Sequence, residues 1–324
     1  MPRLPEIAPI AWEHPADRAA LNALRALPGF DDVVRKVGSF FGERGIRHLF
    51  LANAVRVGPR QRPQLDALLS EVLDTMDWAE RPQLYVTQKP EVNAYAIGFE
   101  HPFIVVTSAA LELLDRDERR VVLGHELGHI ISGHTTYTTI AQILLLIGWR
   151  NLPFLTGLAL LPIELALFEW YRKAELSCDR AGLLATQDPM ASMRVFFKFA
   201  GGLSYGDDVN LDEFLAQARE YETTGTAVDT AFKAINVALR THPFNTVRAG
   251  ELQRWIATGD YDRIVRGEYP RRGSAEAPPF TSDLEEAGSY YAEQARQAAT
   301  QVGEMIGRAR DAVSSAFRSR GNTP

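Results

Sequence analysis

The spacing of hydrophobic and polar positions divides the chain into a helical first part, a short β-rich part and a longer helical part. Residues 1–75 read as mostly helical, with polar breaks at 28–29 and 57–59, and 65–76 (LDALLSEVLDTM) has a clear amphipathic pattern. The pattern then changes. The runs 83–88 (QLYVTQ), 93–98 (NAYAIG) and 102–108 (PFIVVTS) are β-branched or aromatic and are separated by turn residues, which predicts a small antiparallel sheet.

Two helices are predicted directly after this sheet. Ser108 is expected to cap a short helix (AALELL), and Asp115 to cap a longer one that includes 121–134 (VVLGHELGHIISGH). Asp115 and Glu118 have the spacing of a capping box, and their negative charge suits the positive end of the helix dipole. This second helix is therefore strongly specified at its start.

The same helix carries two histidines and a glutamate in an otherwise apolar pattern. His125 and His129 are four residues apart, so they point to one face about one turn apart. Two imidazoles in this arrangement can bind one zinc ion at about 2.0–2.1 Å per bond. Glu126 stands next to the first histidine, where a carboxylate can act as general base on a catalytic water without binding the metal.

The alternative is that this HExxH pattern arose by chance and the histidines are ordinary core residues. Gly124, Gly128 and Gly133 each cost the helix about 1 kcal/mol relative to alanine. A helix that only packs does not favour them, whereas a helix that another backbone or a ligand approaches closely does. The composition of the helix therefore favours the metal site.

The segment 140–168 is strongly apolar but broken. Its two apolar runs, 140–149 and 152–163, are each shorter than the roughly 20 residues of a spanning helix, and Arg150 lies near the middle of the whole segment. One interpretation is a hairpin that dips into a membrane or lies at its surface; the other is a buried helical hairpin or an oligomer contact. The sequence does not decide between them.

Composition excludes some classes of protein. The 324 residues carry a net charge of −6, which gives no electrostatic support to a nucleic-acid partner, and 46% hydrophobic residues are enough for a sizeable core. The single cysteine, Cys178, excludes an intrachain disulfide. No signal peptide is recognisable at the start, so we expect a cytoplasmic protein, with membrane association through 140–168 or the C-terminal helix left open.

A catalytic zinc needs a third protein ligand. Glu175 is the best candidate, on a predicted helix over 170–186, with Asp179 four residues later on the same face as a partner for a ligand histidine. The alternative is a solvated helix face on which Arg172 and Lys173 pair with both acids. We expect Cys178 to be a small buried thiol, His134 to lie at the helix end or surface, and the remaining candidates to be surface residues: His14, His48 and His101.

Three ordered motifs resemble the HtpX-like and CAAX-prenyl-endopeptidase family of gluzincin zinc metalloproteases. They are HELGH at 125–129, ELSCD at 175–179 and HPFNTVR at 242–248, and the resemblance runs from about residue 65 to 260. It implies an α+β fold with a zincin-like core, mainly helical, beside the small sheet. Spanning helices, which membrane-type members carry before HELGH, are not recognisable in residues 1–75.

The resemblance also implies roles for individual residues. His125, His129 and Glu175 would hold one zinc ion (Zn2+) per chain, and Glu126 would be the general base. His242 would sit near the oxyanion, while Asp179 and Arg248 would support the site. Asn93 and Ala94 would lie on a strand that pairs with an extended peptide or unfolded protein substrate, a role that an exposed sheet edge also supports physically.

The chain is accordingly divided into four parts: an N-terminal helical region (1–64), a zinc metalloprotease domain (65–265) with the insertion 140–168, a linker (266–282), and a C-terminal amphipathic helix with its tail (283–324). The expected function is a zinc metalloendopeptidase. Two rivals are a deformylase-like hydrolase, which would want a cysteine ligand before HELGH, and an inactive member that binds partners at a membrane surface. The substrate is not indicated.

Overall fold

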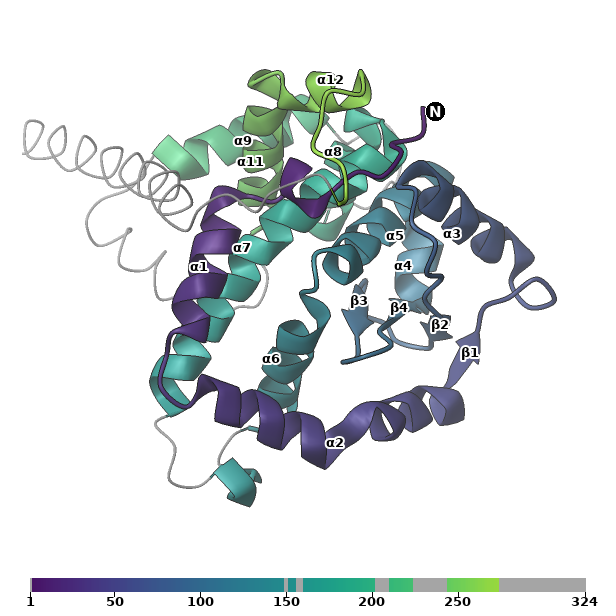
Figure 1. The fold of residues 1–324 in the computed structure, drawn as a ribbon. Coiled ribbons are helices and arrows are strands. Elements are labelled where there is room, and N and C mark those ends of the chain that lie inside the picture. The colour runs from purple at the N-terminus through teal and green to yellow at the C-terminus, as the bar shows by residue number, and fades with distance from the viewer. Residues whose placement is uncertain (1, 149–150, 156–159, 202–209, 224–243, 274–324) are drawn as a thin grey trace, which may run out of the picture.

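The computed structural model describes residues 2–148, 151–155, 160–201, 210–223 and 244–273. Within them the chain is mainly helical, with a small sheet (Figure 1). The helices are η1 (Pro9–Ala11), α1 (Pro15–Arg25), α2 (Phe30–Asn53), α3 (Pro63–Thr75), α4 (Ser108–Leu113), α5 (Arg116–Ile131), α6 (Thr135–Ile147), η3 (Pro153–Leu155), α7 (Leu160–Thr186), α8 (Pro189–Phe199), α9 (Leu211–Thr223), α11 (Asn245–Ala257) and α12 (Asp260–Val265). The strands are β1 (Ala54–Arg56), β2 (Leu84–Thr87), β3 (Ala94–Ile97) and β4 (Phe103–Thr107).

The sheet is mixed, so the prediction of a purely antiparallel sheet is wrong. Its order is β1-β2-β4-β3, with β2 and β4 parallel and the other two pairs antiparallel. All five side chains of β4 are buried, which suits the central position, and β3 is left at the edge. The three predicted strands are present, and β1 is an additional short strand from the N-terminal region.

The helix that carries HELGH lies between the sheet and α7 (Figure 1). Its capping box is present: Asp115 accepts a hydrogen bond from the Glu118 backbone, and Glu118 accepts one from the Asp115 backbone. The helix ends at Ile131, and Gly133 follows with a φ of 70°. The prediction that the helix includes residues 132–134 is therefore wrong. The short helix before it is capped by Thr107 rather than by Ser108.

Close contact between α5 and α7 depends on glycine. A Cβ atom at Gly128 would lie 2.7 Å from the Ala181 Cβ, and one at Gly182 would lie 2.8 Å from the Val121 carbonyl oxygen. These distances are far below van der Waals contact, so only glycine permits the observed approach. The expected close approach is thus confirmed for Gly124 and Gly128, whereas no atom lies within 4 Å of a Cβ built at Gly133.

The apolar segment 140–168 folds into a helical hairpin. Helix α6 packs against α7 and α2, and the inner face of the hairpin is buried in a hydrophobic cluster that also contains residues of α2. Among the described residues, no helix combines the length and the hydrophobicity that crossing a bilayer requires. The outer face keeps several apolar side chains exposed: Leu145, Ile147, Leu161 and Leu165.

The N-terminal region and the residues after α12 pack on the central helices. Helix α1 runs along α7 (Figure 1). Arg271 forms a β-bridge with Ile7, and Arg272 donates to the Asp77 carbonyl oxygen. The C-terminal amphipathic helix expected within 283–324 lies outside the described residues.

Candidate metal centre

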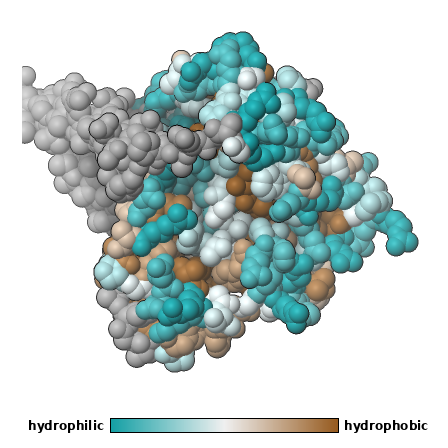
Figure 2. All heavy atoms as spheres, viewed as in Figure 1, coloured by the Kyte–Doolittle hydropathy of each residue, from teal (hydrophilic) through white to brown (hydrophobic). Residues whose placement is uncertain are grey.

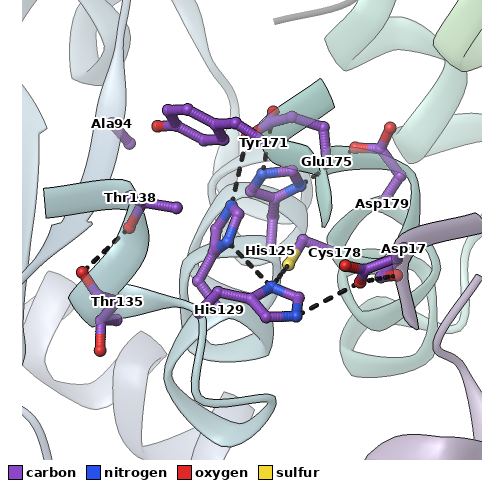
Figure 3. A network of polar contacts seen from close by, with 12 residues as sticks. Asp17, Ala94, His125, His129, Thr135, Thr138, Tyr171, Glu175, Cys178 and Asp179 are labelled. Atoms are coloured by element: carbon purple, nitrogen blue, oxygen red, sulfur yellow. Dashed lines mark hydrogen bonds and ion pairs between the residues drawn. The ribbon is translucent and has the colours of Figure 1, made fainter. Parts of the chain in front are cut away.

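Three side chains from two helices converge beside the sheet. His125 and His129 come from α5 and Glu175 from α7, and all three are buried (Figure 3). The Nε2 atoms of His125 and His129 lie 3.5 Å and 3.2 Å from the two carboxylate oxygens of Glu175. One ligand atom of each residue lies within 4.8 Å of the other two. The spacing of four residues and the glycine-mediated approach of α7 produce this convergence.

The donor set fits zinc. Two imidazole nitrogens and one carboxylate are the protein ligands of a known class of catalytic zinc site, which keeps a fourth position for water or substrate. Burial lowers the pKa of His129 to about 4 despite its hydrogen bond to Glu175, so this imidazole is neutral at pH 7. Burial also opposes protonation of His125, but Glu175 and Asp179 raise the pKa of His125 to about 10. A metal ion that binds here would therefore displace one proton from His125, next to the negative charges of Glu175 and Asp179.

A cavity of about 290 Å³ opens beside this cluster. Glu126 lines it together with His125 and Glu175, so the predicted base and two of the predicted ligands face the same cavity. Asn93 and Ala94 line it from the sheet. Much of the remaining wall is apolar, from Val121, Val122, Val195, Phe196, Phe199 and Phe244. The cavity thus has both polar and apolar walls, which suits an apolar side chain next to a polar reacting group.

The β3 edge borders the cavity. Strand β3 has β4 as its only partner in the sheet that the described residues form. The Asn93 carbonyl oxygen accepts from the Thr107 amide, so by alternation the Ala94 and Ala96 backbone groups point away from β4. The Ala94 amide donates to the Asn93 side-chain oxygen. The strand therefore has the position of an edge to which an extended chain can be added.

Asp179 and Arg248 support His125 at its second ring nitrogen. The His125 Nδ1 atom lies 3.0 Å from the Asp179 carboxylate. Arg248 makes a bidentate contact with Asp179, with Nε at 2.8 Å, and its Nη2 lies 3.5 Å from Glu175. Burial opposes ionisation, yet the Arg248 guanidinium keeps the pKa of Asp179 below its usual value. Asp179 thus remains a carboxylate that can accept a hydrogen bond from the ring Nδ1–H of His125.

The alternative of a solvated helix face for Glu175 and Asp179 is excluded. Glu175 is 1% and Asp179 4% exposed. Arg172 and Lys173 form ion pairs with Glu169 instead.

Two histidines expected at the surface are buried. His134 is 2% exposed, and its Nδ1 lies 3.3 Å from the His129 Nδ1. His14 is also buried and caps α1. The spacing of His134 placed it on another helix face, but α5 ends before it and the turn at Gly133 brings it back to His129. His48 and His101 are exposed as expected, and Cys178 is the predicted buried thiol.

The structure brings together His125, Glu126, His129, Glu175, Asp179, Arg248, Asn93 and Ala94. His242 lies outside the described residues. Sequence reasoning missed Asp17 of α1, whose carboxylate lies 3.3 Å from His134, and the phenylalanines of α8. Asp17 has no motif around it, whereas the aromatic residues of 196–199 form an apolar run that could have indicated a pocket wall.

Comparison with known proteins identifies the family. The profile of peptidase family M48 matches residues 59–256. The chain belongs to this family. The matched segment contains the HELGH, ELSCD and HPFNTVR motifs. As an M48 peptidase it is a metalloendopeptidase, and the family implies a metal cofactor.

The relatives that this chain matches have names of metallopeptidases or proteases. The chain is 35% identical over 259 residues to "Plastoglobule-localized metallopeptidase 48, chloroplastic" of Arabidopsis thaliana, which covers 79% of this chain and 75% of that protein. It is 27% identical over 183 residues to a "Protease HtpX homolog" of Helicobacter pylori, covering 49% of this chain and 59% of that protein. A "Protease HtpX homolog" of Pseudarthrobacter chlorophenolicus is 28% identical over 224 residues, covering 62% and 75%. No solved structure matches.

Proposed function

We propose that this M48 peptidase is a zinc-dependent endopeptidase whose zinc ligands are His125, His129 and Glu175. The observation that carries the proposal is the convergence of two imidazole Nε2 atoms and one carboxylate beside a cavity that His125, Glu126 and Glu175 line. Bound zinc supplies a Lewis acid for the scissile carbonyl and lowers the pKa of a water toward about 7.

The other residues act on the substrate and the water. Glu126 takes a proton from the attacking water and later passes it to the leaving amine. Asp179, itself held by Arg248, accepts a hydrogen bond from the ring Nδ1–H of His125 and fixes which nitrogen faces the metal. His242 is proposed to stabilise the oxyanion, a role that rests on the HPxxxxR motif alone.

An extended peptide or unfolded protein is the proposed substrate. It would add to the β3 edge beside Asn93 and Ala94, with backbone hydrogen bonds supplying affinity that does not depend on its sequence. The apolar residues that line the cavity would then accept an apolar side chain next to the cleaved bond. No feature of the cavity narrows the substrate further.

The test is zinc content measured beside casein cleavage in three proteins: the wild type, Glu126→Gln and Glu175→Ala. We expect one zinc per chain and cleavage in the wild type. Glu126→Gln should keep the zinc and lose cleavage, because its carboxylate is the base and not a ligand. Glu175→Ala should lose both. Retained cleavage in Glu126→Gln, or unchanged zinc in Glu175→Ala, would contradict the proposed roles.

We further propose that the outer face of the α6–α7 hairpin rests on a lipid surface. Exposed apolar side chains gather there: Leu145, Ile147, Leu161 and Leu165, with Phe40 of α2 stacked on Phe154. Hydrophobic atoms are concentrated on this lower part of the molecule in Figure 2. Soluble proteins rarely expose a large apolar patch without a partner.

A further inference from the structure

The two ligand histidines differ in what supports them. The second ring nitrogen of His125 meets the Asp179 carboxylate directly. The second ring nitrogen of His129 meets another imidazole, since its Nδ1 lies 3.3 Å from the Nδ1 of His134. The Nε2 of His134 then lies 3.3 Å from the Asp17 Oδ2. Both ligand histidines are thus connected to a buried carboxylate, one directly and one through a third ring.

Proton counting gives this chain a direction. If the His129 Nε2 binds a metal, its proton must sit on Nδ1, which then donates to His134. The Nδ1 of His134 must accept, so His134 carries its own proton on Nε2. That Nε2–H points at Asp17, which accepts. Only one arrangement of protons satisfies all three residues with neutral imidazoles, and it is the one that leaves the His129 Nε2 lone pair for a metal.

Asp17 is itself rigidly held. Its Oδ1 accepts from the Trp170 Nε1 at 2.9 Å, and its Oδ2 accepts from the Ser177 hydroxyl at 2.6 Å. Asp17 is 1% exposed, and Ser177 also accepts a hydrogen bond from the His14 amide. A buried carboxylate is costly unless donors surround it. Two fixed donors and the His134 ring meet that requirement, so the carboxylate has one orientation.

We propose that Asp17 and His134 are positioning residues that fix the ring orientation and the tautomer of the zinc ligand His129. This rests on the proposed zinc site. Asp17 belongs to α1, outside the segment 59–256 that the family profile matches. The N-terminal helix is therefore part of the metal centre's support, although the motif-bearing domain was expected to begin only at residue 65. Figure 3 shows Asp17 and Cys178 beside the ligand cluster.

The test is zinc affinity measured by competition with a chelator, because it reports on His129 without requiring catalysis. Asp17→Asn places an amide where two donors and His134 need a carboxylate, and it should raise the zinc dissociation constant by about 10- to 100-fold. His134→Leu removes the acceptor for His129 and should do the same. His134→Asn returns an oxygen near the Nδ1 position and should recover most of the affinity. The double variant Asp17→Asn/His134→Leu should bind no more weakly than His134→Leu alone.

Glu118→Gln is the matched control. Glu118 is also a fully buried carboxylate, and it is on the ligand helix, but it pairs with Arg194 and Lys198. Its loss should lower stability without lowering zinc affinity. If Glu118→Gln weakened zinc binding as much as Asp17→Asn, the effect would be general destabilisation and the proposal would fail.

A measurement on the wild type needs no variant to fold. In the zinc-loaded protein with 15N-labelled histidine, we expect His129 to bind zinc through Nε2 and to show a protected, downfield Nδ1 proton. The opposite tautomer would overturn the proposal. Cobalt substitution separates a rival, because His129, His134 and Cys178 also form a group that could hold a metal. An intense thiolate-to-cobalt band would make His134 a ligand and end its positioning role.

The two hypotheses fail differently. A wild type that binds no zinc would remove the proposed function and the positioning role together. A wild type that binds one zinc, with an affinity unchanged by Asp17→Asn and His134→Leu, would keep the function and reject the positioning role.

Discussion

Arg248 forms an ion pair with the buried carboxylate of Asp179, and its Nη2 atom lies 3.5 Å from the buried carboxylate of Glu175. Arg248→Met would remove the guanidinium partner of a buried carboxylate, so we expect the unfolding free energy of the metal-free protein to fall by roughly 3–5 kcal/mol. Urea unfolding at pH 7 measures it. Arg254→Met is the control, because Arg254 is half-exposed and pairs with Glu251 at 2.8 Å, so its loss should cost less than about 1 kcal/mol. Equal losses in the two variants would contradict this role for Arg248.

Glu13 should make stability depend on pH. Burial, aided by the nearby Asp17 charge, raises the pKa of Glu13 from its usual 4.5 to about 6. An acid with a raised folded-state pKa stabilises the fold fully below its unfolded-state pKa, and this stabilisation is lost as the pH rises through 6. The loss amounts to about 2 kcal/mol above pH 7. Glu13→Gln does not ionise, so its stability relative to the wild type should improve by that amount between about pH 4 and pH 8 in urea unfolding. A pH-independent difference would refute the assignment.

At this scale the sequence predicted what is local. His125, Glu126 and His129 are fixed by spacing within one helix, and Glu175 with Asp179 by spacing within another. The His134–Asp17 contact was not predictable, because it needs the turn at Gly133 and the packing of α1 against α7. Burial of His14 has the same cause. Residues whose partners lie more than 100 positions away carry no local pattern that reveals the contact.

At the scale of elements, the approach of α5 to α7 sets the distance between the histidines and Glu175. Gly128→Ala would place a Cβ 2.7 Å from the Ala181 Cβ, and since both helices are rigid we expect a loss of about 1–3 kcal/mol of stability. Zinc affinity should fall with it, because α7 carries Glu175. Chelator competition and urea unfolding measure the two effects.

Gly45→Ala provides the matched control for that substitution. Gly45 is exposed in α2, and no atom lies within 4 Å of a Cβ built there. Alanine has the higher helix propensity, so this variant should gain up to about 1 kcal/mol and leave zinc affinity unchanged. A Gly128→Ala variant as stable as Gly45→Ala would mean that the α5–α7 contact tolerates a methyl group and does not set the site.

Element types were more predictable than their arrangement. The helices and three strands follow from periodicity, and the α5 capping box was correct in detail. The parallel pairing of β2 with β4 was not predicted. The order and direction of strands depend on how the whole sheet packs, which the pattern of a single strand does not reveal. The short strand β1 lacks a pattern of its own: Ala54–Arg56 is half exposed and becomes a strand by pairing with β2.

At the scale of the whole molecule, the exposed face of the α6–α7 hairpin is the feature that the peptidase chemistry does not use. If this face rests on lipid, replacing its apolar side chains by charged ones should abolish binding to vesicles, because a charge at the apolar boundary must be desolvated. We expect Leu161→Glu/Leu165→Glu to lose sedimentation with phospholipid vesicles while zinc content is unchanged. Leu161 is 60% exposed, so its substitution costs the folded state little.

Met190→Glu separates location from hydrophobicity. Met190 is 55% exposed, which is similar to the exposure of Leu161. It lies near the start of α8, on another part of the surface. A lipid contact confined to the hairpin predicts that Met190→Glu sediments with vesicles as the wild type does. Equal loss in both variants would indicate nonspecific adsorption, and wild-type protein that stays in solution with every vesicle composition would reject the lipid surface as the partner. Comparing casein cleavage with and without vesicles would then show whether the hairpin acts on the active site, since α7 carries both the exposed leucines and Glu175.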